Sequence, residues 1–156
     1  MTVDVHATAS DRLRGSGHRY TDRRRELVDL LAAAGSPMSI PEILAGRGDL
    51  KQSSVYRNLA DLEAAGVVRR VATEEEHGRY ELAEDLTGHH HHLMCSRCGT
   101  ISDVEVPGSL ETTLQRALDR LGRRAGFARV SHRLDLIGLC AACSDAGDAP
   151  LSSGQR

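Results

Sequence analysis

The cysteines of this chain stand at spacings that suit metal coordination. All four fall into two C-x2-C pairs, Cys95 with Cys98 and Cys140 with Cys143. Four thiolates form the closed tetrahedral donor set of a structural zinc site, and inside a cell such pairs favour Zn²⁺ over disulfides. We therefore expect one Zn²⁺ to join the two pairs, with disulfides or a redox C-x2-C pair as the alternatives.

An uninterrupted run of four histidines, 89–92, predicts two further metal sites. Successive side chains of an extended strand alternate between its faces, so His90 and His92 share one face while His89 and His91 share the other. Same-face residues lie about 6.6 Å apart along the strand, and at that spacing two imidazoles can converge on one ion. A run of solvated histidines without a specific ion is the alternative.

Carboxylates elsewhere in the chain can complete both sites. On one face, we expect Glu81 and Asp103 to join His90 and His92 in a regulatory site, whose nitrogen and oxygen donors suit Fe²⁺, Mn²⁺ or Zn²⁺. The other face predicts a second site, for which Glu105 is an alternative carboxylate. Its four expected residues are His89, His91, Glu111 and His132. Surface carboxylates without a metal are the alternative interpretation of these acidic residues.

The elements that must position these residues form an α+β chain with two halves. Helices are expected from Thr21 to about 34, over 41–45, and from a Ser53 or Ser54 cap to about 65. Two β-leaning runs, 67–71 and 79–82, follow around an acidic turn. Three helices before a hairpin are typical of a winged helix-turn-helix domain that binds DNA, and a generic small bundle is the alternative.

The second half predicts a small α/β domain. Strands are expected at 89–94, 99–106 and 128–139, with an amphipathic helix over 109–124. Such a sheet covers too little apolar surface by itself, so we expect it to pair with a second copy. The predicted domains are a flexible arm at 1–17, a winged-helix DNA-binding domain at 18–85, a metal-binding dimerisation domain at 86–143 and a disordered tail at 144–156.

Composition narrows the class of protein. The chain has 156 residues and a net charge of −2, but the window 12–70 holds 11 basic and 7 acidic residues, which suits a local phosphate-binding face. We expect no membrane partner and no secretory signal, and therefore a cytoplasmic protein. The sequence has no nucleophile motif and no phosphate loop, so we expect neither an enzyme nor an organic small-molecule substrate.

From Arg14 to Cys143 the chain resembles the ferric uptake regulator family of metal-responsive repressors. The resemblance implies a homodimer that binds palindromic operator DNA when a regulatory metal is present, and so controls metal homeostasis. A peroxide sensor of the same fold, or a zinc-stapled interaction module without DNA binding, is the alternative. The stretches that carry the resemblance are Arg19-Tyr20-Thr21, Ser54-Val55-Tyr56-Arg57-Asn58-Leu59, Ala65-Gly66-Val67-Val68, Arg79-Tyr80-Glu81, the block from His89 to Gly99, and Ser131-His132-Arg133-Leu134-Asp135 leading to Cys140.

The resemblance also implies roles for single residues. It places Tyr56 and Arg57 on the recognition helix, near thymine methyls and phosphates or guanine. The further candidates for DNA contact are Arg19, Ser53 and Ser54. The family's regulatory site corresponds to Glu81, His90 and His92, with Asp103 as a carboxylate of the peroxide-sensing branch. Its second site corresponds to His89, His91 and His132, with Glu111 within one residue of its carboxylate.

The chain departs from the family pattern in three places. Many members supply a regulatory histidine before the second helix, where this chain reads Ser36-Pro37-Met38-Ser39. The zinc-sensing branch has a cysteine before the histidine run and an acidic residue after the first wing strand, whereas this chain has no cysteine before Cys95 and carries Arg69 at the acidic position. His18 and His77 are the alternatives for a replacement ligand.

Overall fold

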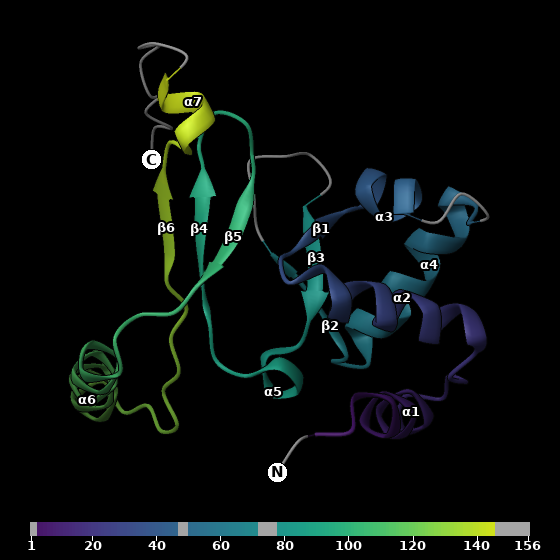
Figure 1. Cartoon of the computed structure of the whole chain (residues 1–156). Coiled ribbons are helices and arrows are strands. Elements are labelled where there is room, and N and C mark those ends of the chain that lie inside the picture. Colours follow the sequence, from purple (N-terminus) through teal and green to yellow (C-terminus); the bar gives the residue numbers. More distant parts are fainter. Residues whose placement is uncertain (1–2, 47–49, 72–77, 146–156) are drawn as a thin grey trace. The chain divides into compact units, whose positions relative to one another are not determined.

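The computed structural model of the chain describes residues 3–46, 50–71 and 78–145 (Figure 1). The chain divides into two compact units, Met1–His89 and His90–Arg156. None of the helices in the described ranges has the length and apolar content needed to span a membrane.

The first unit packs helices against a small antiparallel sheet whose strand order is β1-β3-β2. In β2 and β3, Val68 pairs with Leu82 and Val71 with Arg79, which gives the predicted hairpin. Residues 74–77 of its predicted acidic turn lie outside the described residues. The elements of the unit are α1 (Val5–Gly15), α2 (Asp22–Ala34), β1 (Met38–Ser39), α3 (Ile40–Gly46), α4 (Gln52–Ala64), β2 (Val68–Val71), β3 (Arg79–Leu82) and α5 (Glu84–Thr87).

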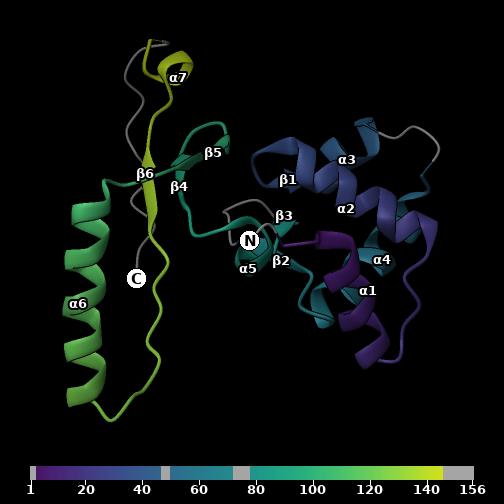
Figure 2. The same cartoon turned by 60° about the horizontal axis from the view of Figure 1, so that its bottom comes forward.

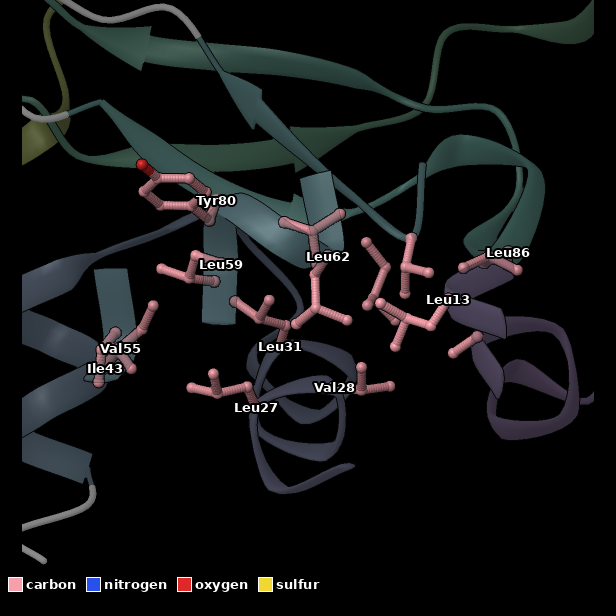
Figure 3. Packing of buried hydrophobic residues seen from close by; sticks show 14 of the residues in the cluster. Leu13, Leu27, Val28, Leu31, Ile43, Val55, Leu59, Leu62, Tyr80 and Leu86 are labelled. Atoms are coloured by element: carbon pink, nitrogen blue, oxygen red, sulfur yellow. The ribbon is translucent and has the colours of Figure 1, made fainter. Parts of the chain in front are cut away.

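An aliphatic core holds these elements together (Figure 3). Leu27 and Leu31 of α2 and Leu59 and Leu62 of α4 are buried at the helical spacing expected for an inward stripe. A capping box begins α3, because the Ser39 N–H donates to Glu42 Oε2 at 2.7 Å and the Glu42 N–H donates to Ser39 Oγ at 3.4 Å.

The helix α4 starts slightly earlier than its sequence predicts. Its N-cap residue is Lys51, which makes no side-chain capping bond, so the expectation that Ser53 or Ser54 caps this helix is wrong. Both serines instead lie in the first turn with exposed side chains. The helix ends before Gly66, whose φ of 70° is a left-handed conformation that glycine adopts without strain.

The prediction of a flexible arm at 1–17 is also wrong for most of its length. Residues Val5–Gly15 form α1, which begins where the side chain of Asp4 accepts the N–H of Ala7 at 3.0 Å. One turn apart on this helix, Ala9 and Leu13 are fully buried in the core. These buried residues and the cap help to order a segment whose composition alone favours disorder.

The second unit contains a three-stranded sheet of order β5-β4-β6. The strand β4 runs antiparallel to β5 and parallel to β6. The elements of the unit are β4 (His91–Cys95), β5 (Ile101–Val104), α6 (Gly108–Arg124), β6 (Asp135–Gly138) and α7 (Ala141–Asp145). The first two residues of the predicted tail at 144–156 belong to α7, and the rest lie outside the described residues.

Only the end of the long strand predicted at 128–139 forms. It pairs as β6, while residues 128–134 have no regular structure and run beside α6 (Figure 2). Within this segment, the Val130 carbonyl oxygen accepts a hydrogen bond from the side-chain amide of Gln115 of α6 at 2.9 Å. At this position a side chain therefore bonds a carbonyl that a neighbouring strand would bond in a sheet.

The two ends of the apolar stripe of α6 are exposed within the single chain. Leu110 and Leu121 keep 53% and 63% of their surface accessible, and Ile137 of the edge strand β6 keeps 72%. Among the described residues of this unit, Cys95 and Ile101 are the only buried apolar side chains. The unit thus has almost no aliphatic core of its own.

Candidate metal centres and nucleic-acid interface

The four cysteines meet at one end of the second sheet. Cys95 ends β4, Cys98 follows it, and Cys140 and Cys143 flank the start of α7. The four sulfur atoms all lie within 4.8 Å of one another, and Cys98 Sγ is 3.7 Å from Cys140 Sγ. A tetrahedral Zn²⁺ with bonds of about 2.3 Å separates its sulfurs by about 3.8 Å, so the donor type and the spacing both fit zinc.

Hydrogen bonds prepare two of these thiols for metal binding. The N–H of Cys140 donates to Cys95 Sγ at 3.4 Å and is the largest of the effects that lower the pKa of Cys95 to about 6. Cys98 Sγ and Thr100 Oγ1 share a hydrogen bond of 3.2 Å, and this contact lowers the pKa of Cys98. Burial, followed by the neighbouring thiols, raises the pKa of Cys143. Four thiolates therefore need a cation among them.

A cluster in the same unit joins β4, α6 and the segment before β6. His91 Nε2 lies 2.9 Å from Glu111 Oε2, and His132 Nε2 lies 3.0 Å from Glu111 Oε1. The two imidazole rings are stacked with their centroids 5.3 Å apart, and His91 is only 2% exposed. A carboxylate between two imidazole nitrogens is a mixed donor set that fits a divalent transition ion.

Gln115 determines which nitrogen of His132 faces this cluster. The Gln115 amide donates to the Val130 carbonyl oxygen at 2.9 Å and to Asp119 Oδ1 at 2.8 Å, so its oxygen is left to accept. That oxygen lies 3.1 Å from His132 Nδ1, which therefore donates to it. The lone pair of Nε2 then points toward Glu111, as a metal ligand requires.

The other side of β4 carries a second group of potential ligands. The rings of His90 and His92 lie with centroids 5.3 Å apart, and potential ligand atoms of these histidines and Asp103 lie within 4.8 Å of one another. Asp103 is placed by the register of β5, in which it pairs directly with His92. His92 Nδ1 lies 3.1 Å from Asp135 Oδ1, so Nε2 is the nitrogen available to an ion.

The alternation of side chains from His90 to His92 therefore follows the strand geometry predicted for the run. His91 contacts the α6 cluster, whereas His90 and His92 contact each other on the opposite side. The strand β4 is shorter than predicted, since it begins at His91 rather than at His89.

The two remaining expected ligands belong to the first unit. Glu81 lies in β3 directly opposite Arg69 of β2, and Arg69 Nε is 2.5 Å from Glu81 Oε1. His89, the last residue of the unit, pairs through Nδ1 with Glu84 Oε1. The same Glu84 lies 3.5 Å from Arg69 Nη1. The two expected ligands are thus linked through one arginine and one carboxylate.

Other expected ligands do not join these groups. Glu105 is exposed and belongs to none of the metal-ligand clusters in the described part of the chain. His18 lies 3.8 Å from Asp61, and His77 lies outside the described residues. Two residues that hold the imidazoles were not anticipated as partners, namely Asp135 and Gln115. Gln115 stands one helical turn after Glu111, which was the available sequence signal.

The candidate DNA contacts all have exposed side chains in the first unit: Arg19, Ser53, Ser54, Tyr56 and Arg57. Four of them lie on the outer face of α4, whose inner face is buried at Val55, Leu59 and Leu62. A cavity of about 240 Å³ beside the start of α4 has Arg23 and Lys51 among its lining residues. Exposed polar groups and two cations at a helix N-terminus suit contact with phosphates.

A buried arginine fixes the direction of α4. Arg24 of α2 is 8% exposed, and its Nε donates to Asn58 Oδ1 at 3.2 Å. Its other nitrogens pair with Asp61 and donate to the Arg19 carbonyl oxygen at 2.5 Å. This network ties the exposed helix to the rest of its unit and to the segment that carries Arg19.

Comparison with known proteins places these features in a family context. The sequence model described as the Ferric uptake regulator family matches residues 15–137. The chain is 28% identical over 140 residues to a ferric uptake regulation protein of Neisseria meningitidis serogroup A, covering 86% of this chain and 92% of that protein. It is 28% identical over 140 residues to the peroxide operon regulator of Bacillus subtilis, covering 87% and 91%.

A solved structure shows a similar fold. The ferric uptake regulator of Helicobacter pylori, whose structure is described as revealing three functional metal binding sites, aligns with a TM-score of 0.67 at 25% identity. The alignment covers 92% of this chain and 95% of that one. The similarity thus extends over both compact units.

Proposed function

Because this chain belongs to the ferric uptake regulator family, we propose that it is a repressor that binds palindromic operator DNA as a homodimer when a regulatory metal ion is bound. Its α+β fold with a structural zinc site is that of the family, and the chain is a metal-responsive transcription regulator rather than an enzyme. We further propose that it acts in the cytoplasm, where operator DNA is found.

One observation carries the metal-dependent part of the proposal. The histidine run divides between two carboxylate clusters, with His91 beside Glu111 and His92 paired in register with Asp103. We assign the structural zinc to the four cysteines, 95, 98, 140 and 143. The proposed regulatory ligands are Glu81, His90, His92 and Asp103, and the proposed second-site ligands are His89, His91, Glu111 and His132. The regulatory ion is Fe²⁺, Zn²⁺ or Mn²⁺.

The regulatory ligands suggest how metal would control DNA binding. Glu81 belongs to the unit that carries α4, whereas His90, His92 and Asp103 belong to the other unit. An ion held by both would restrict the two units to one arrangement. In a dimer, that arrangement would set the spacing of two α4 helices, and only one spacing fits successive major grooves of a palindrome. Metal and operator would then favour the same state.

The exposed apolar surface of the second unit supports the homodimer. Leu110 and Leu121 of α6 and Ile137 of β6 are mostly exposed within one chain. The unit has little aliphatic core, so a second copy would supply apolar contacts that the monomer lacks. We propose that the dimer forms through α6 and the β6 edge.

The direct test is DNA binding at controlled metal concentration. Protein loaded with zinc in the cysteine site is titrated into promoter DNA with Mn²⁺, and again after a chelator has removed the weaker-bound metal. We expect operator affinity to be roughly 10–100 times higher with Mn²⁺, which is the typical range of allosteric coupling. Binding that is equal under both conditions, or absent under both, would contradict the proposed function.

Arg57→Ala is expected to weaken operator binding by about 1–3 kcal/mol if the guanidinium contacts a base. The side chain is exposed on the outer face of α4, so its loss should leave folding unchanged. If Arg57 contacts only phosphate, the salt dependence of binding should decrease by about one counterion. Affinity is measured by fluorescence anisotropy across a salt series, with Glu63→Gln on the same helix as the control. If Arg57→Ala has the same operator affinity and the same salt dependence as the parent, Arg57 does not contact the DNA.

A further inference from the structure

The proposed regulatory ligand Glu81 already has a cation as its neighbour. Arg69 and Glu81 face each other across the β2–β3 pairing, with Arg69 Nε 2.5 Å from Glu81 Oε1. Their side chains are only 13% and 8% exposed, so water screens this ion pair weakly. Both residues belong to the first unit, and the contact needs no metal.

Arg69 also has a second carboxylate within reach. Its Nη1 lies 3.5 Å from Glu84 Oε2, and the other oxygen of Glu84 pairs with His89 Nδ1. The guanidinium can therefore leave Glu81 without losing every anionic partner. Its planar group with five donors is suited to such an exchange between two carboxylates.

We propose that Arg69 is an internal cation that competes with the regulatory metal for Glu81 and so sets the affinity of that site. This inference rests on the proposed function, because it takes Glu81 as a ligand of the regulatory ion. A divalent ion at Glu81 must either displace the guanidinium or lie beside it at a few ångströms. Like charges repel at that distance, and the weak screening at Glu81 makes the repulsion stronger. The metal therefore binds less tightly with Arg69 present than without it.

The competition lowers affinity without removing any ligand. The regulatory site therefore fills at a higher concentration of free metal than the same four ligands would require without Arg69. A guanidinium displaced from Glu81 would compete for Glu84 with His89, a proposed ligand of the second site. Filling of the regulatory site would then make His89 more available to the second site.

Arg69→Gln is expected to increase the affinity for Mn²⁺ by about tenfold, a typical coupling between two ligands. Affinity is measured on the full chain with zinc retained in the cysteine site, by competition with a chromophoric chelator. Arg69→Lys keeps the positive charge and should stay within about threefold of the parent. Arg70→Gln is the matched control, because it removes the same charge from the neighbouring, exposed position of β2. It should bind Mn²⁺ like the parent.

Glu81→Gln distinguishes the role of Glu81 as a metal ligand from the competition by Arg69. It should weaken Mn²⁺ binding, and Arg69→Gln should tighten binding less in the Glu81→Gln background than in the parent, since the part of its effect that acts through Glu81 is then absent. If Glu81→Gln leaves Mn²⁺ affinity unchanged, the proposed regulatory ligand set is wrong. If Glu81→Gln weakens binding but Arg69→Gln does not tighten it, only the competition is refuted.

A thermal melt of each variant without Mn²⁺ shows whether the first unit, which contains β2 and β3, still folds. Should Arg69→Gln unfold it, Arg69→Met replaces it in the comparison, because methionine keeps the apolar stem that packs along the sheet. Tightening by Arg69→Met supports the competition, whereas parental or weaker affinity overturns it.

Discussion

Cys95→Ser is expected to release the structural zinc and to unfold the second unit. Among the described residues of that unit, only Cys95 and Ile101 are buried apolar side chains, so the sheet has little else to hold it. Apparent zinc-binding energies of four-ligand structural sites are about 10–16 kcal/mol, which exceeds what so small a core contributes. The expected effect is therefore loss of structure rather than a modest decrease in melting temperature.

The measurements are zinc content by mass spectrometry, hydrogen exchange of the sheet amides and oligomeric state by light scattering. Cys95→Ser should lose zinc, exchange rapidly in β4 and β6, and fail to dimerise. The first unit has its own core and should keep slow exchange in α2 and α4. Ser144→Ala, an exposed substitution next to Cys143, is the control. Retained zinc and unchanged exchange in Cys95→Ser would refute the structural role.

The double substitution His90→Ala/His92→Ala is expected to abolish the metal dependence of operator binding. It removes two of the four proposed regulatory ligands and leaves the cysteines intact. The remaining carboxylates, Glu81 and Asp103, do not by themselves make a tight site for a transition ion. Operator affinity with Mn²⁺ should therefore fall to the level that the parent shows with chelator, roughly 10–100 times weaker.

Retained zinc and an unchanged melting temperature would show that the double variant is folded. Ser102→Ala, which changes an exposed residue of β5 beside Asp103, serves as the control and should respond to Mn²⁺ like the parent. If the histidine variant still binds operator tightly in Mn²⁺ and weakly in chelator, the regulatory ion is held by other residues. That result would not affect the assignment of the structural zinc to the four cysteines.

Local sequence patterns predicted much of the first unit. The helices predicted at 21–34 and 53–65 and the hairpin predicted at 67–71 and 79–82 rest on short-range patterns, and the structure confirms them. The helix α1 was missed because its order depends on burial of Ala9 and Leu13 against elements far along the chain. Two apolar residues one turn apart are too weak a local pattern to identify such a helix.

In the second unit too, features that depend on residue spacing were predicted, whereas features that depend on tertiary contacts were not. The cysteine pairs and the alternation of the histidines could be read from spacing. By contrast, the pairing of Asp135 with His92 depends on the parallel register of β4 and β6, and the capture of residues 128–134 depends on Gln115. Register and side-chain bridges are set by tertiary packing, which a single sequence does not reveal.

The absence of any spacer between the histidines limits how this stretch can change. Deleting Leu93 or Met94 would turn every preceding side chain of the strand to the opposite side of the backbone. His90 and His92 would then lie on the side that faces Glu111 and His91 on the side that faces Asp103, while the cysteines stayed where they are. Deletion of one residue should therefore change the histidine ligands of both sites at once, whereas a substitution changes one ligand at a time. We expect this stretch to tolerate insertions or deletions only of two residues at a time, because two residues are one period of a strand.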